Sequence, residues 1–90
     1  MEINIEDDFK EICIQILAEG KSEAEWDESP ACDWFQTERF VGGFESPEKA
    51  FTFSYFDEQK QEFWFTLTLE EVNDIVESKK HTLEVRNADR

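Results

Sequence analysis

The sequence has few of the residues that carry most catalytic and cofactor chemistry: one histidine, two cysteines, three glycines and two prolines among 90 residues. It contains no C-x-x-C pair, no glycine-rich phosphate loop and no calcium-loop spacing, so the common signals for metal and nucleotide sites are missing. The histidine, His81, stands beside two lysines, where we expect a solvated turn residue. Because a nucleophile also needs a positioned base, we expect no enzyme activity, no catalytic residues, no metal and no cofactor.

Long apolar runs are missing as well. No segment approaches the roughly 18 apolar residues of a membrane-spanning helix, and no basic stretch followed by an apolar one marks a secretory signal. We therefore expect a cytoplasmic protein whose thiols stay reduced. Cys13 falls on the apolar side of an expected helix and Cys32 in a loop, and we do not expect them to form a disulfide.

Positive charge is the third scarcity. Nine Lys and Arg face 23 Asp and Glu, which gives a net charge of −14. Residues 1–33 hold eleven of the acids and two of the bases, so most of the imbalance lies in the first third. Such a field repels nucleic acid and anionic lipid and attracts basic surfaces. We expect no direct nucleic-acid binding and no membrane binding, whereas a protein that itself binds nucleic acid remains a candidate partner.

Aromatic residues, by contrast, are abundant at 14% of the chain. A chain of this length builds one core, so we expect residues 1–90 to form a single domain whose burial comes mainly from large rings. Seven of the thirteen aromatic residues fall between residues 49 and 71. That concentration indicates either a packed core or a surface that grips a partner.

The N-terminal segment has a helical pattern. Apolar residues from Ile5 to Leu17 recur at intervals of three and four, which predicts a helix over about 5–19. Asn4 is a plausible N-cap, and Gly20 supplies a left-handed stop. An alternative is that residues 1–5 begin as a short strand.

Residues 21–33 have no period and predict a loop. A strand from Trp34 to Val41 follows, and Gly42 and Gly43 are expected to break it. The next segment predicts a turn, with Ser46 as a cap and Pro47 at the first position.

Residues 50–56 and 62–67 alternate apolar and polar side chains and predict two strands of a hairpin. If their two apolar sets share one face, the loop between them has an odd number of residues, and the absence of Gly and Asn favours the five-residue loop 57–61. The core pairs are then Phe51/Leu67, Phe53/Phe65 and Tyr55/Phe63. Phe56 and Trp64 are left on the opposite face, as diagonal neighbours.

The C-terminal part begins with a capping box, Thr68 with Glu71, which opens a helix to about Ser78. Lys79 and Lys80 stand at its favourable end, and residues 81–87 predict a short edge strand. We thus predict an α+β fold in the order α-β-β-β-α-β: a small antiparallel sheet of three to four strands with two helices on one face. An extra N-terminal strand is the open alternative.

Three groups of residues are candidates for partner binding. Two tryptophans lie among the acids of the 21–33 loop and just after it, and Trp is enriched at interface hot spots. The competing interpretation is that these tryptophans cap a small core. The candidates are Trp26, Asp27, Glu28, Asp33 and Trp34 around the loop; Asp7, Asp8 and Glu11 on the first helix; and Phe56 and Trp64 on the outer face of the hairpin.

The leading hypothesis is an acidic, non-catalytic protein that inhibits or neutralises a nucleic-acid-acting protein by occluding its basic surface. In composition the chain is comparable with phage inhibitors and toxin-immunity proteins, although it matches no family that we identify. Carboxylates at i+4 positions are about 6 Å apart along a helix, against one charge per about 1.7 Å in duplex DNA, so nucleic-acid mimicry would need the 23–33 segment as well. The alternative is a general interaction or regulatory module that docks through its sheet face or an edge strand. Its oligomeric state is left open between monomer and dimer.

Overall fold

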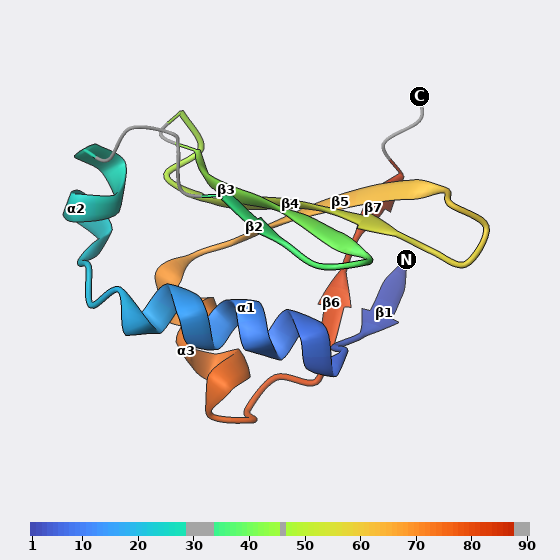
Figure 1. Ribbon diagram of the computed structural model, residues 1–90, viewed down its shortest axis with the longest axis horizontal. Helices are drawn as coiled ribbons and strands as arrows, with labels where there is room; N and C mark the ends of the chain where they lie inside the picture. The colour runs from blue at the N-terminus through green and yellow to red at the C-terminus, as the bar shows by residue number, and fades with distance from the viewer. Residues whose placement is uncertain (29–33, 46, 88–90) are drawn as a thin grey trace.

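The structure is a computed structural model that describes residues 1–28, 34–45 and 47–87. It is an α+β fold with a five-stranded antiparallel sheet in the order β2-β3-β4-β5-β7 and a separate two-stranded pair, β1-β6 (Figure 1). The strands are β1 Glu2–Asn4, β2 Trp34–Gln36, β3 Phe40–Glu45, β4 Ala50–Phe56, β5 Glu62–Leu67, β6 Thr82–Glu84 and β7 Arg86–Asn87, and the helices are α1 Asp7–Ala18, α2 Glu23–Glu28 and α3 Leu69–Val76. The α+β class was predicted correctly, but the described chain has a larger sheet and one more helix than expected.

The N-terminal segment combines both predicted alternatives. Residues 2–4 pair with β6, and α1 begins only at Asp7, so Asn4 is a strand residue and not the N-cap. Glu6 occupies the N-cap position without a side-chain cap hydrogen bond. The end of the helix is as predicted, because Gly20 has a φ of +66° in the left-handed region that glycine adopts without strain.

The hairpin of β4 and β5 has the predicted register. Phe51 pairs with Leu67, Phe53 with Phe65 and Tyr55 with Phe63. Within the five-residue loop, the Asp57 carboxylate accepts hydrogen bonds from the backbone N–H groups of Gln59 and Gln61, each at 2.9 Å. The Asp57 side chain thus fixes the loop backbone by the hydrogen bonds that Asp and Asn typically make in turns.

The predicted strand over 34–41 is in fact two strands. β2 ends at Gln36, and β3 begins at Phe40 and runs through both glycines to Glu45. The chain turns between them where Thr37 donates its N–H to the Phe40 carbonyl at 2.8 Å. Gly42 does not break the strand. It is required inside it, because a Cβ there would lie 2.8 Å from the Phe53 Cα. The predicted cap at Ser46 lies outside the described residues, and a turn follows at 47–49.

The capping box at the start of α3 is confirmed. The Thr68 hydroxyl accepts from the Glu71 N–H at 3.2 Å, and the Glu71 carboxylate accepts from the Thr68 N–H at 3.0 Å. Lys79 and Lys80 do not lie in the last turn of the helix, which ends at Val76; they pair instead with Glu77 and Glu71. The expected edge strand is divided, since β6 joins β1 while β7 joins β5.

One hydrophobic core lies between the five-stranded sheet and the helices. α1 and α3 lie on the same side of this sheet, and no described helix covers its other face (Figure 1). Phe9 of α1 contacts Phe53 and Phe65 edge-on, with ring centroids 5.2 and 5.4 Å apart. Edge-on contacts of this kind are the geometry that aromatic rings favour in cores. The hairpin rings that alternate inward thus serve the core.

Candidate partner-binding surfaces

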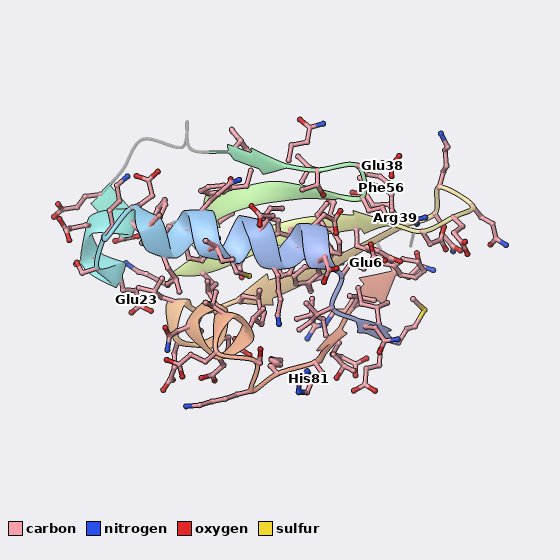
Figure 2. The ribbon with its side chains drawn as sticks, turned by 60° about the horizontal axis from the view of Figure 1, so that its bottom comes forward. Glu6, Glu23, Glu38, Arg39, Phe56 and His81 are labelled. Atoms are coloured by element: carbon pink, nitrogen blue, oxygen red, sulfur yellow. The ribbon has the colours of Figure 1, made fainter. Side chains whose placement is uncertain are left out.

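Ten of the 23 acidic residues lie within the three helices. We call the outward surface of the three helices the helical layer; Figure 2 looks onto it, with α1 and α3 next to each other and α2 at one end. Within the helix bounds there is one base, Lys10, against ten carboxylates. The carboxylates are Asp7, Asp8 and Glu11 of α1, Glu23, Glu25, Asp27 and Glu28 of α2, and Glu70, Glu71 and Asp74 of α3.

Few of these carboxylates are neutralised by a base. Asp27 is paired with Lys49 at 2.8 Å and Glu71 with Lys80 at 2.9 Å. Glu11, Glu28 and Glu70 are exposed and form no ion pair within the part of the chain that the structure describes. One such carboxylate on each helix leaves the layer with a strong negative field.

Two carboxylates of the layer are held in the ionised form by hydrogen bonds. For Glu71, burial works to raise the pKa, but hydrogen bonds from the Thr68 backbone and the Lys80 ammonium outweigh it and lower the pKa below its ordinary value of 4.5. For Glu25, the hydrogen bond from the Ser22 backbone N–H, at 2.9 Å, lowers the pKa. Both groups are therefore anionic at neutral pH and add to the field of the layer.

The opposite side of the sheet has another composition. Residues paired across antiparallel strands point to the same face, so the register defines an outward sheet face that turns away from the helices. Its residues are Trp34, Gln36, Val41, Gly43, Glu45, Ala50, Thr52, Ser54, Phe56, Glu62, Trp64, Thr66 and Arg86. Only Glu45, Glu62 and Arg86 are charged, which gives a net charge of −1.

Two tryptophans lie on this face. Trp34, on edge strand β2, is 58% exposed and is the most exposed aromatic ring of the described chain. Trp64, on β5, is half-buried, and the Arg86 guanidinium lies over its ring at 5.1 Å from the centroid. Beside it, the Ser54 hydroxyl donates to the Glu62 carboxylate at 2.7 Å. The outward sheet face is thus nearly neutral and carries one ring, that of Trp34, which is more than half exposed.

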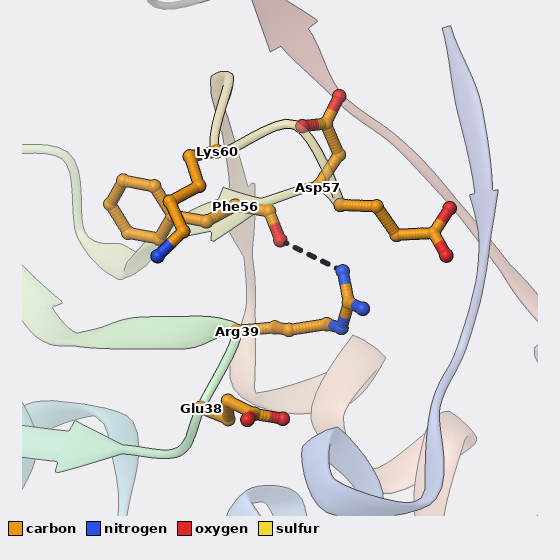
Figure 3. Close-up of a pocket in the computed structure, with 6 residues that line it drawn as sticks. Glu38, Arg39, Phe56, Asp57 and Lys60 are labelled. Atoms are coloured by element: carbon orange, nitrogen blue, oxygen red, sulfur yellow. Dashed lines mark hydrogen bonds between the residues drawn. The ribbon is translucent and has the colours of Figure 1, made fainter.

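Phe56 is the diagonal neighbour of Trp64 on the outward sheet face, as predicted, and it also lines a hollow of about 310 Å³ between the β2–β3 turn and the β4–β5 loop (Figure 3). Arg39 crosses this hollow and donates to the Phe56 carbonyl at 3.4 Å, while its Nε lies 3.9 Å from Glu6. Asp57, Glu58, Lys60 and Glu38 complete the lining. The lining of the hollow contains both acidic and basic residues, and Arg39 already interacts with Phe56 and Glu6. The hollow therefore shows no preference for an anionic or a cationic ligand.

The sequence placed two tryptophans among the loop acids, and the structure separates them. Residues 21–28 are not a loop, since they contain α2, and Trp26 is 1% exposed. Its ring packs on Phe51 and Phe35, at centroid distances of 5.1 and 6.4 Å. Trp26 is therefore a core residue and not an exposed interface ring. Asp33 and Cys32 lie outside the described residues.

The other predicted site residues divide between the two surfaces. The α1 acids and the α2 acids belong to the helical layer, whereas Trp34, Phe56 and Trp64 belong to the outward sheet face. Sequence reasoning missed the acids of α3, although the apolar stripe of that helix already implied an acidic outer side that includes Glu70 and Asp74.

No helix of the described ranges is long and apolar enough to cross a membrane. Comparisons of the chain with known protein families, with curated proteins and with solved structures find no match.

Proposed function

We propose that this chain is an acidic, non-catalytic binding protein that inhibits or neutralises a nucleic-acid-acting protein by occluding its basic surface. The observation that carries the proposal is the helical layer, where three helices hold ten carboxylates and one lysine; Lys49 and Lys80 from neighbouring segments pair with two of the ten. A basic, DNA- or RNA-binding surface of a partner is the complement of such a layer.

The three helices together present a denser set of carboxylates than a single helix can. Carboxylates along one helix recur only about every 6 Å, which is too sparse to stand in for a nucleic-acid backbone. α1 and α3 pack directly against each other and α2 lies at one end, so three separate groups of carboxylates contribute to the layer: one at the start of α1, one on α3 and one on α2. Groups from three helices oppose a broader basic patch than one helix does, so the partner we propose is a nuclease, a toxin or a nucleic-acid-binding complex.

The test compares two variants of equal net charge. The first replaces one exposed, unpaired carboxylate on each helix: Glu11→Gln, Glu28→Gln and Glu70→Gln. The control replaces three exposed carboxylates in the turns at the ends of the sheet: Glu38→Gln, Glu48→Gln and Glu58→Gln. Each protein is immobilised and used to capture proteins from an extract of the native host, and bound proteins are then challenged with duplex DNA.

We expect the parent and the control variant to retain a basic nucleic-acid-acting protein that duplex DNA displaces, because both ligands occupy the same surface. The helical-layer variant should capture it with a slower association rate, and the difference should shrink as salt screens the field. Capture of only acidic or uncharged proteins, or equal loss in both variants, would contradict the proposal.

A second candidate function is a general interaction module that docks another protein through the outward sheet face or edge strand β2. The observation that favours it is the 58% exposure of Trp34 on a nearly neutral face. Association through that face should depend weakly on salt and should be lost in a Trp34→Thr variant, whereas the glutamine variants on the helices should leave it intact.

A further inference from the structure

The outward stripe of α1 changes from acidic to apolar along its length. Asp7, Glu11, Ile14 and Ala18 follow one another at intervals of three or four residues, so they share one side of the helix. All four are exposed, and Ile14 keeps 48% of its surface in solvent. Because the core takes the other side of the helix, Ile14 and Ala18 form an apolar patch on the second half of α1.

Carboxylates from all three helices lie around this apolar patch. Glu11 precedes it on the same stripe, and Figure 2 shows the second half of α1 beside α3 and next to α2, which carry Glu70 and Glu28. An apolar centre with a polar rim is the usual anatomy of a protein–protein interface. The helical layer therefore has more than charge to offer a partner.

The bases nearest to the apolar patch in sequence are directed at other groups. The Lys10 ammonium donates to the Ser78 hydroxyl at 3.0 Å. The Lys21 ammonium lies over the Trp26 ring, 4.5 Å from its centroid. The surroundings of the patch thus keep their negative field, which attracts cations to the place where Ile14 is exposed.

We propose that the helical layer takes a cationic amphipathic segment of a protein, in which apolar side chains stand between lysines or arginines. The inference rests on the proposed function and names the chemistry of the basic surface that the layer covers. Charge complementarity selects the lysines and arginines for the carboxylates, and the apolar patch selects the apolar side chain between them. A partner surface made of bases alone would gain nothing from Ile14.

The exposed fraction of Ile14 sets the size of the effect. Covering the exposed half of an isoleucine side chain should tighten binding about fivefold, by the ordinary gain for burial of apolar surface. This gain does not depend on charge, so it should persist at high salt. The attraction between bases and carboxylates should weaken under the same conditions.

Two synthetic peptides of equal length and equal lysine content serve as probes. The first has leucine at positions i, i+3, i+4 and i+7 of a helical pattern, and the second has glutamine there, which favours a helix about as well. Calorimetric titration of each peptide into the full chain, at about 0.15 M and about 0.5 M salt, gives two dissociation constants. Their ratio measures the preference for the apolar peptide.

Four variants locate this preference. Ile14→Gln and Ile14→Ala remove the apolar side chain and introduce residues that favour a helix at least as well. Trp34→Thr removes the exposed ring of the outward sheet face and tests whether the leucines bind there instead. The fourth variant combines Glu11→Gln, Glu28→Gln and Glu70→Gln and tests the carboxylates. Circular dichroism checks that each variant keeps the fold.

We expect the parent and Trp34→Thr to bind the leucine peptide about fivefold more tightly than the glutamine peptide at both salt concentrations. Both Ile14 variants should bind the two peptides within about twofold of each other. The triple glutamine variant should lose affinity for both peptides to the same extent.

The failure of this inference differs from that of the proposed function. Equal binding of the two peptides by the parent would overturn the inference alone, as would a preference that survives both Ile14 variants or disappears in Trp34→Thr. Peptides that bind the parent no more tightly than the triple glutamine variant would contradict the proposed function and the inference with it.

Discussion

The helical layer and the outward sheet face both meet solvent, yet they differ sharply in charge. Within their bounds the three helices carry ten acids and one base, whereas the five strands of the large sheet carry two acids and one base. Part of the reason is local, since Glu favours helices and β-branched Thr favours strands. Like charges that face each other across strands are also only about 5 Å apart, which penalises an acidic sheet.

The comparison teaches that charge and exposed rings are separate features of this protein. In the sequence Trp26 and Trp34 are flanked by acids, which suggests one surface that combines both. In the fold Trp26 enters the core and Trp34 points away from the helices. An electrostatic partner and one that binds an exposed ring would therefore meet different faces of the molecule.

The largest change in stability should come from substitutions on the buried face of the sheet, compared with one on its outward face. Phe65 of β5 is 3% exposed and Phe53 of β4 fully buried, so Phe53→Ala and Phe65→Ala should each cost about 3–5 kcal/mol. Their outward neighbour Thr66 is exposed, and the isosteric Thr66→Val should change stability by less than about 0.5 kcal/mol. Chemical denaturation at low micromolar concentration measures all three. Equal losses of stability in the Phe variants and in Thr66→Val would contradict the assignment of the buried and exposed faces.

A second test concerns how closely β3 and β4 approach each other. Gly42→Ala would place a Cβ 2.8 Å from the Phe53 Cα, and because backbone must move, we expect a cost of about 3 kcal/mol. At Gly20 nothing lies within 4 Å of an added Cβ and only the positive φ opposes it, so Gly20→Ala should cost about 1 kcal/mol. Thermal unfolding ranks the two. If Gly20→Ala proved the more costly, the close approach at Gly42 would not limit the packing.

A third test separates a structural carboxylate from the rest of the helical layer. Thr68→Ala should cost about 1 kcal/mol through loss of the cap. Because the pKa of Glu71 is lowered in the folded state, its charge contributes stability at pH values above 4.5 that is lost as pH falls through the folded-state pKa. Glu71→Gln should therefore lower stability slightly at pH 7 and make the loss of stability in acid less steep.

The control for that test is Glu70→Gln, which removes a carboxylate from the same turn without touching the capping box. Unfolding monitored by circular dichroism between pH 3 and pH 7 compares the two, with an expected difference at neutral pH of a few tenths of a kcal/mol for a partly exposed pair. An acid limb as steep in Glu71→Gln as in the parent would show that the hydrogen bonds to Glu71 do not stabilise the fold.

The smallest expected effect is a gain in the free energy of unfolding. Glu11 stands four residues after Asp7 on α1, and like charges at this spacing destabilise a helix by about 0.2–0.5 kcal/mol. Glu11→Gln should raise stability by about that amount at low salt, and the gain should disappear at high salt. Glu58→Gln, in the β4–β5 loop, serves as the control. A stabilisation that persists at high salt would mean that the charge of the helical layer does not weaken the fold.

The parts of the fold that were predicted correctly depend on contacts close in sequence. Side-chain alternation over 50–56 and 62–67, with an odd loop, was enough for the register of β4 and β5. The capping box depends on Thr68 and Glu71, which are three residues apart, and the end of α1 on the conformation of Gly20 alone. Alternation, capping and backbone freedom act within a few residues, so a single sequence contains them in full.

The parts that were predicted wrongly depend on which distant segments meet. Trp26 belongs to the core because rings from β2, β3 and β4 surround it. Gly42 continues β3 instead of breaking it because the backbone of β4 lies directly beside it. Whether an acidic helix and an exposed ring share a face follows from how helices and sheet are stacked. The sequence by itself determined the hairpin register, the capping box of α3, the end of α1 at Gly20 and the excess of acid. Only the tertiary structure decided that the acid lies on one side and Trp34 on the other, because burial is a property of contacts between segments far apart in the chain.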